Sequence, residues 1–127
     1  MTTSIAICTY NGEKFLRKQL ESIFAQTVPA DEIVICDDGS KDDTLKILEE
    51  YQNRFPEILK IYQNETNLGF SKNFEKAIYL CTKDIIITSD QDDIWKKNKL
   101  EETLNFFTQN PDFEAVFNDL EIVDEQL

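Results

Sequence analysis

The sequence predicts an α/β fold in which a mostly parallel sheet is flanked by helices on both faces. Two observations indicate this class. Short apolar runs rich in β-branched and aromatic residues recur along the chain, and stretches with apolar residues at helical spacing separate them. This alternation favours parallel strands joined by right-handed helical crossovers. The chain of 127 residues fits a single domain, and no internal repeat or low-complexity linker divides it.

Each element is predicted from its own pattern, in the order of the chain. The predicted strands cover residues 5–8, 33–36, 58–62, 85–88 and 115–117. Their nearly continuous apolar character is typical of strands that are buried on both faces of a sheet. Apolar stripes at helical spacing predict helices within residues 15–24, 45–55, 70–81 and 100–107. In such a sheet, ligands bind beyond the carboxyl ends of the strands, where the loops gather.

Composition excludes several kinds of function. The chain has 13 Lys and Arg against 25 Asp and Glu, a formal net charge of −12 and no histidine. That balance disfavours nucleic acid or an anionic lipid surface as a partner, and it rules out histidine-based catalysis. Cys8, Cys36 and Cys81 each lie in an apolar stretch, which predicts small core residues of an intracellular protein. No signal peptide or membrane span is evident, so we expect a cytoplasmic protein.

An acidic cluster follows the second predicted strand. Ser40 and Asp43 have the spacing of a capping box for the next helix, with Gly39 in the turn. That role leaves Asp37 and Asp38 unexplained, because two adjacent carboxylates at the mouth of a buried strand contribute nothing to a cap three residues later. We therefore expect at least one of them to bind a ligand at the edge of the sheet.

A second acidic cluster, SDQDDIW at residues 89–95, follows the fourth predicted strand. On an extended segment Asp90 and Asp92 share one face, with Cα atoms roughly 6.5–7 Å apart. Such oxygen ligands suit Mg²⁺ or Mn²⁺, and an acidic protein needs a cation to hold a phosphorylated anion at an acidic edge. Asp93 is expected to start a helix, and Trp95 to pack in the core.

Other cofactor motifs are missing from the sequence. Neither GxGxxG nor GxxxxGK[ST] occurs, which weighs against dinucleotide-binding and P-loop sites, and CxxC and HExxH are also absent.

Four ordered segments resemble a known family. ICTYNGEKFL, IVICDDGSKDDT, NLGFSKNFEKAI and SDQDDIWKKNKL are similar, in this order and spacing, to the nucleotide-sugar-binding half of family 2 glycosyltransferases, which have a Rossmann-like GT-A fold. The resemblance covers essentially the whole chain. It implies transfer of a sugar from a UDP or dTDP sugar to a hydroxyl of a saccharide acceptor, usually with inversion and with Mn²⁺ or Mg²⁺. The SDQDDIW variant further suggests cell-surface polysaccharide synthesis, with rhamnosyl transfer as one form.

The resemblance implies a role for each matching residue. Thr9 and Tyr10 would lie beside the nucleotide base, and Asp38 would accept a hydrogen bond from the pyrimidine N3–H. Asp90 would face the ribose, and Asp92 would bind the metal that bridges the diphosphate and stabilises the departing nucleotide.

The sequence departs from the family pattern in two places. Phe74 stands where many members have an arginine, and Lys72 is the expected substitute for its phosphate contact. The chain also ends at Leu127, before the acceptor half that carries the catalytic base in the family; Asp119 is the nearest carboxylate, and we assign no base. Residues 1–127 are thus expected to be an incomplete donor-binding domain that transfers no sugar alone.

Two alternatives remain open at this stage. A receiver-type phospho-regulatory domain is also a parallel α/β fold with an acidic metal pocket, but it needs a lone aspartate after the middle strand, where this chain has Tyr62, Gln63 and Asn64. A non-catalytic nucleotide-sugar-binding module is the second alternative. Exposed strand edges would also allow a homodimer.

Overall fold

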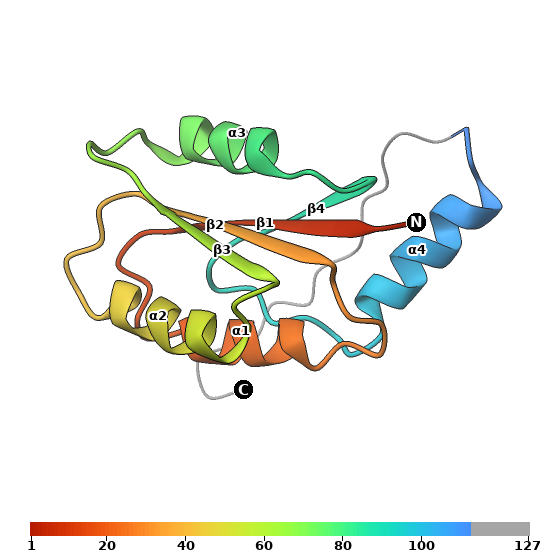
Figure 1. The fold of residues 1–127 in the computed structure, drawn as a ribbon, viewed down its shortest axis with the longest axis horizontal. Coiled ribbons are helices and arrows are strands. Elements are labelled where there is room, and N and C mark those ends of the chain that lie inside the picture. Colours follow the sequence, from red (N-terminus) through yellow and green to blue (C-terminus); the bar gives the residue numbers. More distant parts are fainter. Residues whose placement is uncertain (113–127) are drawn as a thin grey trace.

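The computed structural model describes residues 1–112, in which four parallel strands alternate with four helices (Figure 1). The strands are β1 (Thr3–Thr9), β2 (Glu32–Asp37), β3 (Leu59–Gln63) and β4 (Ile85–Ser89), in the sheet order β3-β2-β1-β4. The helices are α1 (Leu16–Phe24), α2 (Thr44–Arg54), α3 (Phe70–Leu80) and α4 (Lys99–Gln109). The predicted alternation and parallel pairing are confirmed. The predicted strand at 115–117 and Asp119 lie outside the described residues.

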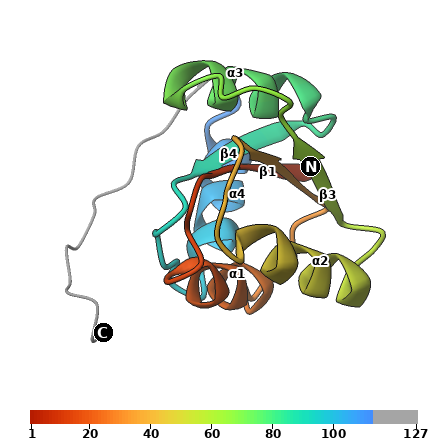
Figure 2. The same ribbon diagram turned by 90° about the vertical axis from the view of Figure 1, so that its left-hand side faces the viewer.

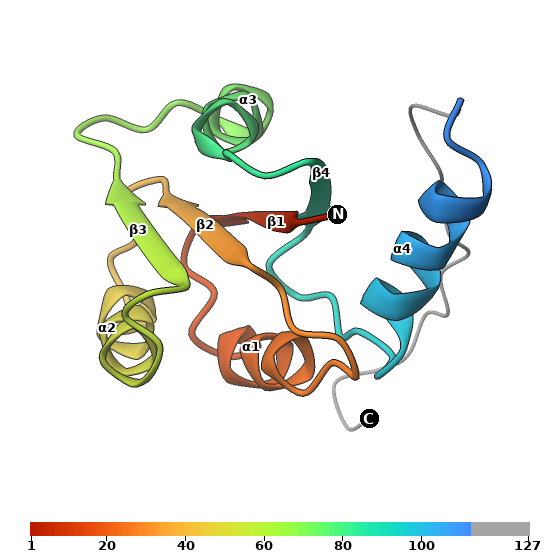
Figure 3. The same ribbon diagram turned by 45° about the vertical axis from the view of Figure 1, so that its right-hand side comes forward.

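The sheet forms the middle of three layers. Helix α3 covers one face, and α1 and α2 cover the other, as the end-on view shows (Figure 2). Helix α4 stands beside the sheet and is reached by a long connection from β4 that runs past α1 (Figure 3). Loops that leave the carboxyl ends of the strands therefore gather at one edge of the molecule.

The two faces of the sheet have cores of different size. Toward α1 and α2, isoleucines of β1 and β2 pack with Leu16, Leu20 and Leu48 in the larger cluster. Toward α3, small residues that include Cys8 and Cys36 pack against Ala77. Both of these cysteines are buried and free, as predicted, whereas Cys81 is only partly buried. Burial raises the pKa of the Cys8 thiol to about 12, so this thiol is unreactive at neutral pH.

Burial on both faces was predicted for every strand, and the prediction is right only for β1 and β2. Every residue of these two strands is buried, whereas β3 and β4 each contain exposed positions. The reason is their place in the sheet, because β3 and β4 form the two edges of the described part. Ile86 of β4, for example, is 39% exposed.

The apolar stripe of α3 is also less buried than its spacing predicts. Ala77 is fully buried, but Phe70 is 69% exposed and Ile78 is 39% exposed.

Within residues 1–112, no helix is long and apolar enough to cross a bilayer.

Candidate functional site

A cavity of about 510 Å³ opens where the carboxyl ends of β1, β2 and β4 meet. Five of the six predicted site residues line it: Thr9, Tyr10, Asp38, Asp90 and Asp92. The structure does not bring the sixth, Lys72, to the cavity, since it is exposed on α3 and absent from the lining.

The β2–α2 turn is built around Asp37, which is fully buried. Its carboxylate accepts hydrogen bonds from Thr9 Oγ1 at 2.8 Å, from Ser40 Oγ at 2.6 Å and from the backbone N–H groups of Gly39 and Ser40. Gly39 has φ 92°, a conformation that favours glycine. Asp37 is therefore a structural residue, and of the two adjacent aspartates only Asp38 lines the cavity.

The predicted capping box at the start of α2 is wrong. Ser40 bonds to Asp37, and Asp43 forms no side-chain cap. Asp42 has that role instead, because its Oδ1 accepts a hydrogen bond at 2.9 Å from the N–H of Thr44, the first residue of the helix.

Asp38 is held by three donors from the segment that leads into α3. Its Oδ1 accepts hydrogen bonds from the Leu68 N–H at 2.7 Å and from Asn64 Nδ2 at 2.9 Å, and its Oδ2 accepts one from the Gly69 N–H at 3.0 Å. Burial acts to raise the pKa of Asp38, but these hydrogen bonds outweigh it and lower the pKa. The carboxylate is ionised at neutral pH, and Oδ2 keeps capacity for a further donor.

Three asparagines that the sequence reasoning missed surround Asp38. Asn64 also donates to Asn73 Oδ1 at 2.8 Å and accepts from Lys76 Nζ at 2.6 Å. Asn73 donates to the backbone oxygen of Cys36 at 2.9 Å, and Asn67 donates to the backbone oxygen of Asp38 at 3.0 Å. The signal was present, since Asn67 and Asn73 lie in the NLGFSKNFEKAI segment and Asn64 directly follows β3.

The acidic segment after β4 is a turn, so the prediction of an extended segment is wrong. The N–H of Asp93 donates to the backbone oxygen of Asp90 at 3.1 Å, which closes the turn 90–93. Asp90 and Asp92 still both line the cavity, and Gln91, expected on the opposite face, lines it too.

The predicted helix start at Asp93 is also wrong, because α4 begins only at Lys99. Trp95 is 5% exposed and packs in the larger core, as predicted.

Gln91 joins this turn to the β1–α1 loop. Its Oε1 accepts a hydrogen bond at 2.8 Å from the backbone N–H of Tyr10. A Cβ atom at Gly12 would lie 2.6 Å from the same oxygen, so glycine leaves the room for this contact. The side chain of Tyr10 is 47% exposed at the mouth of the site.

The electrostatics of the cavity favour a cation. Burial raises the pKa of Asp90, and the neighbouring charges of Asp93 and Asp92 raise it further. Among the described residues that line the cavity, none is a lysine or an arginine. Nor do residues 1–112 contain a group of three or more Cys, Asp or Glu side chains arranged to hold a metal ion. The carboxylates are suitable ligands for a hard cation, which would need further oxygen ligands from water or from a bound phosphate.

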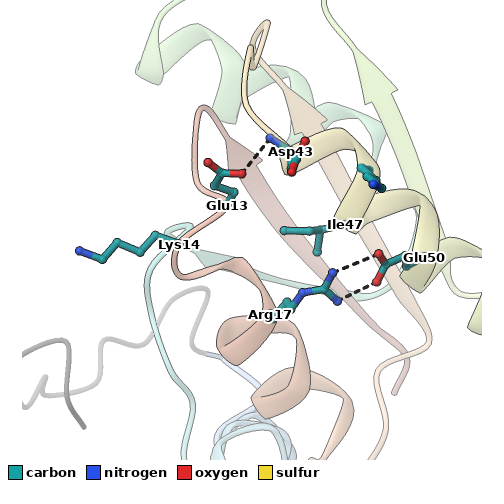
Figure 4. A pocket seen from close by; sticks show the side chains of 7 residues that line it. Glu13, Lys14, Arg17, Asp43, Ile47 and Glu50 are labelled. Atoms are coloured by element: carbon teal, nitrogen blue, oxygen red, sulfur yellow. Dashed lines mark hydrogen bonds and ion pairs between the residues drawn. The ribbon is translucent and has the colours of Figure 1, made fainter.

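A second hollow, of about 590 Å³, lies between the first turns of α1 and α2 (Figure 4). Several of its polar groups bond to one another. Arg17 donates two hydrogen bonds to Glu50, at 2.7 and 3.0 Å, and Glu13 accepts one at 3.1 Å from the backbone N–H of Asp43. None of the predicted site residues lines this hollow, so the cavity at the strand ends is the better candidate site.

Comparison with known proteins gives consistent results for sequence and structure. The model of the family described as Glycosyl transferase family 2 matches residues 4–124. An uncharacterized glycosyltransferase of Nostoc sp. is 34% identical over 98% of this chain and 38% of its own length. A dTDP-rhamnosyl transferase of Shigella flexneri is 40% identical over 82% of this chain and 37% of its own length. The chain thus spans well under half of these curated relatives.

Solved structures share the fold. Residues 1–349 of TarS from S. aureus, in complex with UDP, superpose with a TM-score of 0.79 at 33% identity, covering 87% of this chain and 33% of that one. A mannosyltransferase from Pyrobaculum calidifontis, in complex with GDP-Man and Mn²⁺, has a TM-score of 0.76 at 22% identity, covering 83% of this chain and 32% of that one. The expected GT-A fold is confirmed.

Proposed function

The chain belongs to glycosyl transferase family 2, and on that premise we propose that its parent protein transfers a sugar from a nucleotide-diphosphate sugar to a hydroxyl group of a saccharide acceptor. The observation that carries the proposal is the composition of the cavity at the strand ends. It combines an ionised, hydrogen-bonded acceptor, Asp38, with the carboxylates of Asp90 and Asp92 and with no basic side chain among the described lining residues. Membership of the family leaves no support for the receiver-type alternative.

The nucleoside would bind at the Asp38 side of the cavity. Asp38 Oδ2 would accept the N3–H of a pyrimidine, while Thr9 and Tyr10 would lie beside the base and Asp90 would face the ribose. Asp38 suits this role because three donors fix its carboxylate and keep its pKa low. Phe70 and Phe74, whose rings pack edge to face with centroids 5.0 Å apart, supply an apolar wall nearby.

The diphosphate would bind together with Mn²⁺ or Mg²⁺, with Asp92 as the protein ligand. Phe74 occupies the place of the expected arginine, and Lys72 does not line the cavity, so the lining residues offer a diphosphate no positive charge. A divalent cation held by Asp92 would resolve this conflict, because its positive charge would offset the charge of the diphosphate. When bound, the ion would stabilise the negative charge on the departing nucleotide.

The relatives support a narrower proposal about substrate. The similarity to a dTDP-rhamnosyl transferase and to a UDP-bound TarS structure favours a pyrimidine nucleotide, dTDP or UDP, as the carrier. We place the reaction in cell-surface polysaccharide synthesis, with inversion at the anomeric carbon and rhamnose as one candidate sugar. The free thiols of Cys8, Cys36 and Cys81 are consistent with work in the cytoplasm.

Calorimetry with UDP and dTDP, each in Mn²⁺ and in chelator, tests the proposal directly. We expect at least one nucleotide to bind with Mn²⁺ and to bind at least about tenfold more weakly in chelator, because the lining carboxylates otherwise repel a diphosphate. ADP serves as the control, since it lacks the pyrimidine N3–H. Equal binding in the two conditions, or no binding in either, would contradict the donor-site assignment.

A further inference from the structure

Three polar side chains of the α1 region are bonded to backbone groups of residues 90–100, which comprise the long connection between β4 and α4 and the first residues of α4. Gln19 and Ser22 lie in α1, and Gln26 lies just beyond its end; the spacing places all three on one side of the helix. Their partners are the Asp90 carbonyl, the Trp95 N–H, the Lys96 carbonyl and the Leu100 N–H. The connection has no regular secondary structure, so these contacts fix its path beside α1 (Figure 3).

Gln19 acts at the end of this connection that carries the acidic turn 90–93. Its Nε2 donates to Ser89 Oγ at 2.9 Å and also to the backbone oxygen of Asp90. The same Asp90 oxygen accepts the Asp93 N–H that closes the turn. Gln19 thus bonds to the atom on which the geometry of the turn depends, and it does so from the buried side of α1.

The burial of Gln19 points to a role beyond packing. The residue is fully buried, yet its Oε1 has no hydrogen-bond partner among residues 1–112. An apolar residue would fill a core position on α1 without an unpaired polar atom, as Leu16, Leu20 and Ile23 do on the same helix. What an apolar residue cannot supply is the pair of N–H donors at the end of β4.

We propose that Gln19 is a positioning residue, which holds the turn 90–93 in the geometry that lets Asp92 bind a divalent cation together with a nucleoside diphosphate. This inference rests on the proposed function of the site. Gln19 itself does not line the cavity and is expected to touch neither metal nor nucleotide. Its effect passes through the backbone of Asp90.

The test compares Gln19→Met with Gln26→Met in the full 127-residue chain. Both substitutions replace a buried amide that bonds this connection by an unbranched side chain without donors, but Gln26 acts at Lys96 and Leu100, away from the turn. We expect Gln19→Met to weaken Mn²⁺-dependent binding of UDP or dTDP by roughly tenfold or more, as for other residues that orient metal ligands. Gln26→Met should have a melting temperature similar to that of Gln19→Met, but it should bind the nucleotide with wild-type affinity.

Hydrogen exchange separates positioning from general destabilisation. Backbone amides of residues 90–95 should exchange faster in Gln19→Met, while the amides of β1 and β2 keep their protection. If Gln19→Met does not fold, Gln19→Asn, which shortens the side chain by one methylene, is used in the same measurements.

Different outcomes overturn different claims. Equal losses of affinity in the two methionine variants, or unchanged exchange in residues 90–95, would contradict the positioning role and leave the proposed function standing. If wild-type protein binds neither UDP nor dTDP with Mn²⁺, the proposed function fails, and the inference fails with it.

Discussion

Two carboxylates at opposite ends of the sheet, Glu32 and Asp90, have pKa values that are shifted in opposite directions. At the amino end, Glu32 of β2 is 1% exposed and accepts hydrogen bonds from Ser4 Oγ at 2.7 Å, Lys60 Nζ at 2.6 Å and the Thr82 N–H at 2.8 Å. Burial acts to raise the pKa of Glu32, but these partners outweigh it and lower the pKa to about 2. At the carboxyl end, Asp90 lies beside Asp92 and Asp93, and its pKa is raised.

The contrast distinguishes a carboxylate that stabilises the fold, Glu32, from carboxylates that are available to bind a ligand. The Glu32 carboxylate ties β1, β2, β3 and the connection after α3 together, so its charge is matched from within the chain. The acidic turn brings like charges together, and within residues 1–112 none of its carboxylates forms an ion pair with a lysine or an arginine. Charge repulsion of that kind persists in proteins mainly where a cation or substrate relieves it.

The largest expected effect is on stability, at the amino end. Glu32→Gln should lower the free energy of unfolding by about 3 kcal/mol, because it removes a buried charge with several bonded donors. Chemical denaturation measures the loss. Glu50→Gln is the matched control, since it breaks the exposed ion pair with Arg17 and should leave the denaturation midpoint unchanged. A comparable loss of stability in both variants would show that Glu32 supports the fold no more than an exposed carboxylate does.

The pH dependence of stability should come from the same group. The pKa of Glu32 is lowered on folding, from 4.5 to about 2, so its contribution is complete above pH 4.5 and is lost as the pH falls toward 2. The full shift corresponds to roughly 3 kcal/mol. Other carboxylates titrate in the same range, and therefore the quantity to measure is the difference between wild-type and Glu32→Gln stability. That difference should shrink steadily from pH 5 to pH 2.5; a constant difference would rule out the linkage.

At the carboxyl end, substitution should affect binding instead. Asp92→Asn should weaken Mn²⁺-dependent binding of UDP or dTDP by at least about tenfold, near 1.4 kcal/mol, while the melting temperature stays within the experimental error. Asp93→Asn is the control, because Asp93 belongs to the same turn but does not line the cavity. Calorimetry in Mn²⁺ measures the affinity of both variants. Equal losses of affinity would show that binding depends on the total charge of the turn and not on direct ligation of the metal by Asp92.

The smallest expected effect has the opposite sign to that at Glu32. Asp90→Asn removes one of three neighbouring charges and should raise the stability of the ligand-free protein slightly, by up to about 0.5 kcal/mol, since the group is exposed. Thermal melts at low ionic strength are the sensitive measurement, because salt screens the repulsion. A clear loss of stability would mean that Asp90, like Glu32, has a supporting role.

The order of elements could be predicted from the sequence because the apolar runs of β1 and β2 are buried on both faces and long enough to be distinctive. The exposed positions of β3 and β4 could not, since they follow from the order of strands in the sheet, which no spacing along the chain encodes. The stripe at residues 100–107 predicted α4, but the helix start expected at Asp93 was wrong. The chain between Asp93 and α4 is held by Ser22, which bonds to Trp95, and Gln26 bonds to Leu100 in the first turn of α4; these contacts join residues more than 70 positions apart.

The site shows the same division. Spacing and motif identified the strand ends and the aspartates that line the cavity. Spacing could not separate Asp37 from Asp38, because their roles depend on their donors: the local turn and Thr9 bond to Asp37, whereas the segment before α3 bonds to Asp38. The amides of Asn64 and Gln91 were missed for a similar reason. Their partners, Asp38 and Tyr10, lie 26 and 81 positions away in the sequence.

The hydrogen bond from the Tyr10 N–H to Gln91 joins two loops that would contact different parts of one ligand. If binding of a base orders the Tyr10 loop, the hydrogen bond to Gln91 also partly orders the acidic turn. A metal ion that binds afterwards then loses less conformational entropy in the turn. Nucleoside and ion would then favour each other without touching, and thermodynamic reciprocity requires the two enhancements to be equal. Titration of uridine with and without Mn²⁺, and of Mn²⁺ with and without uridine, would measure both factors; affinities that do not change in either titration would exclude this coupling.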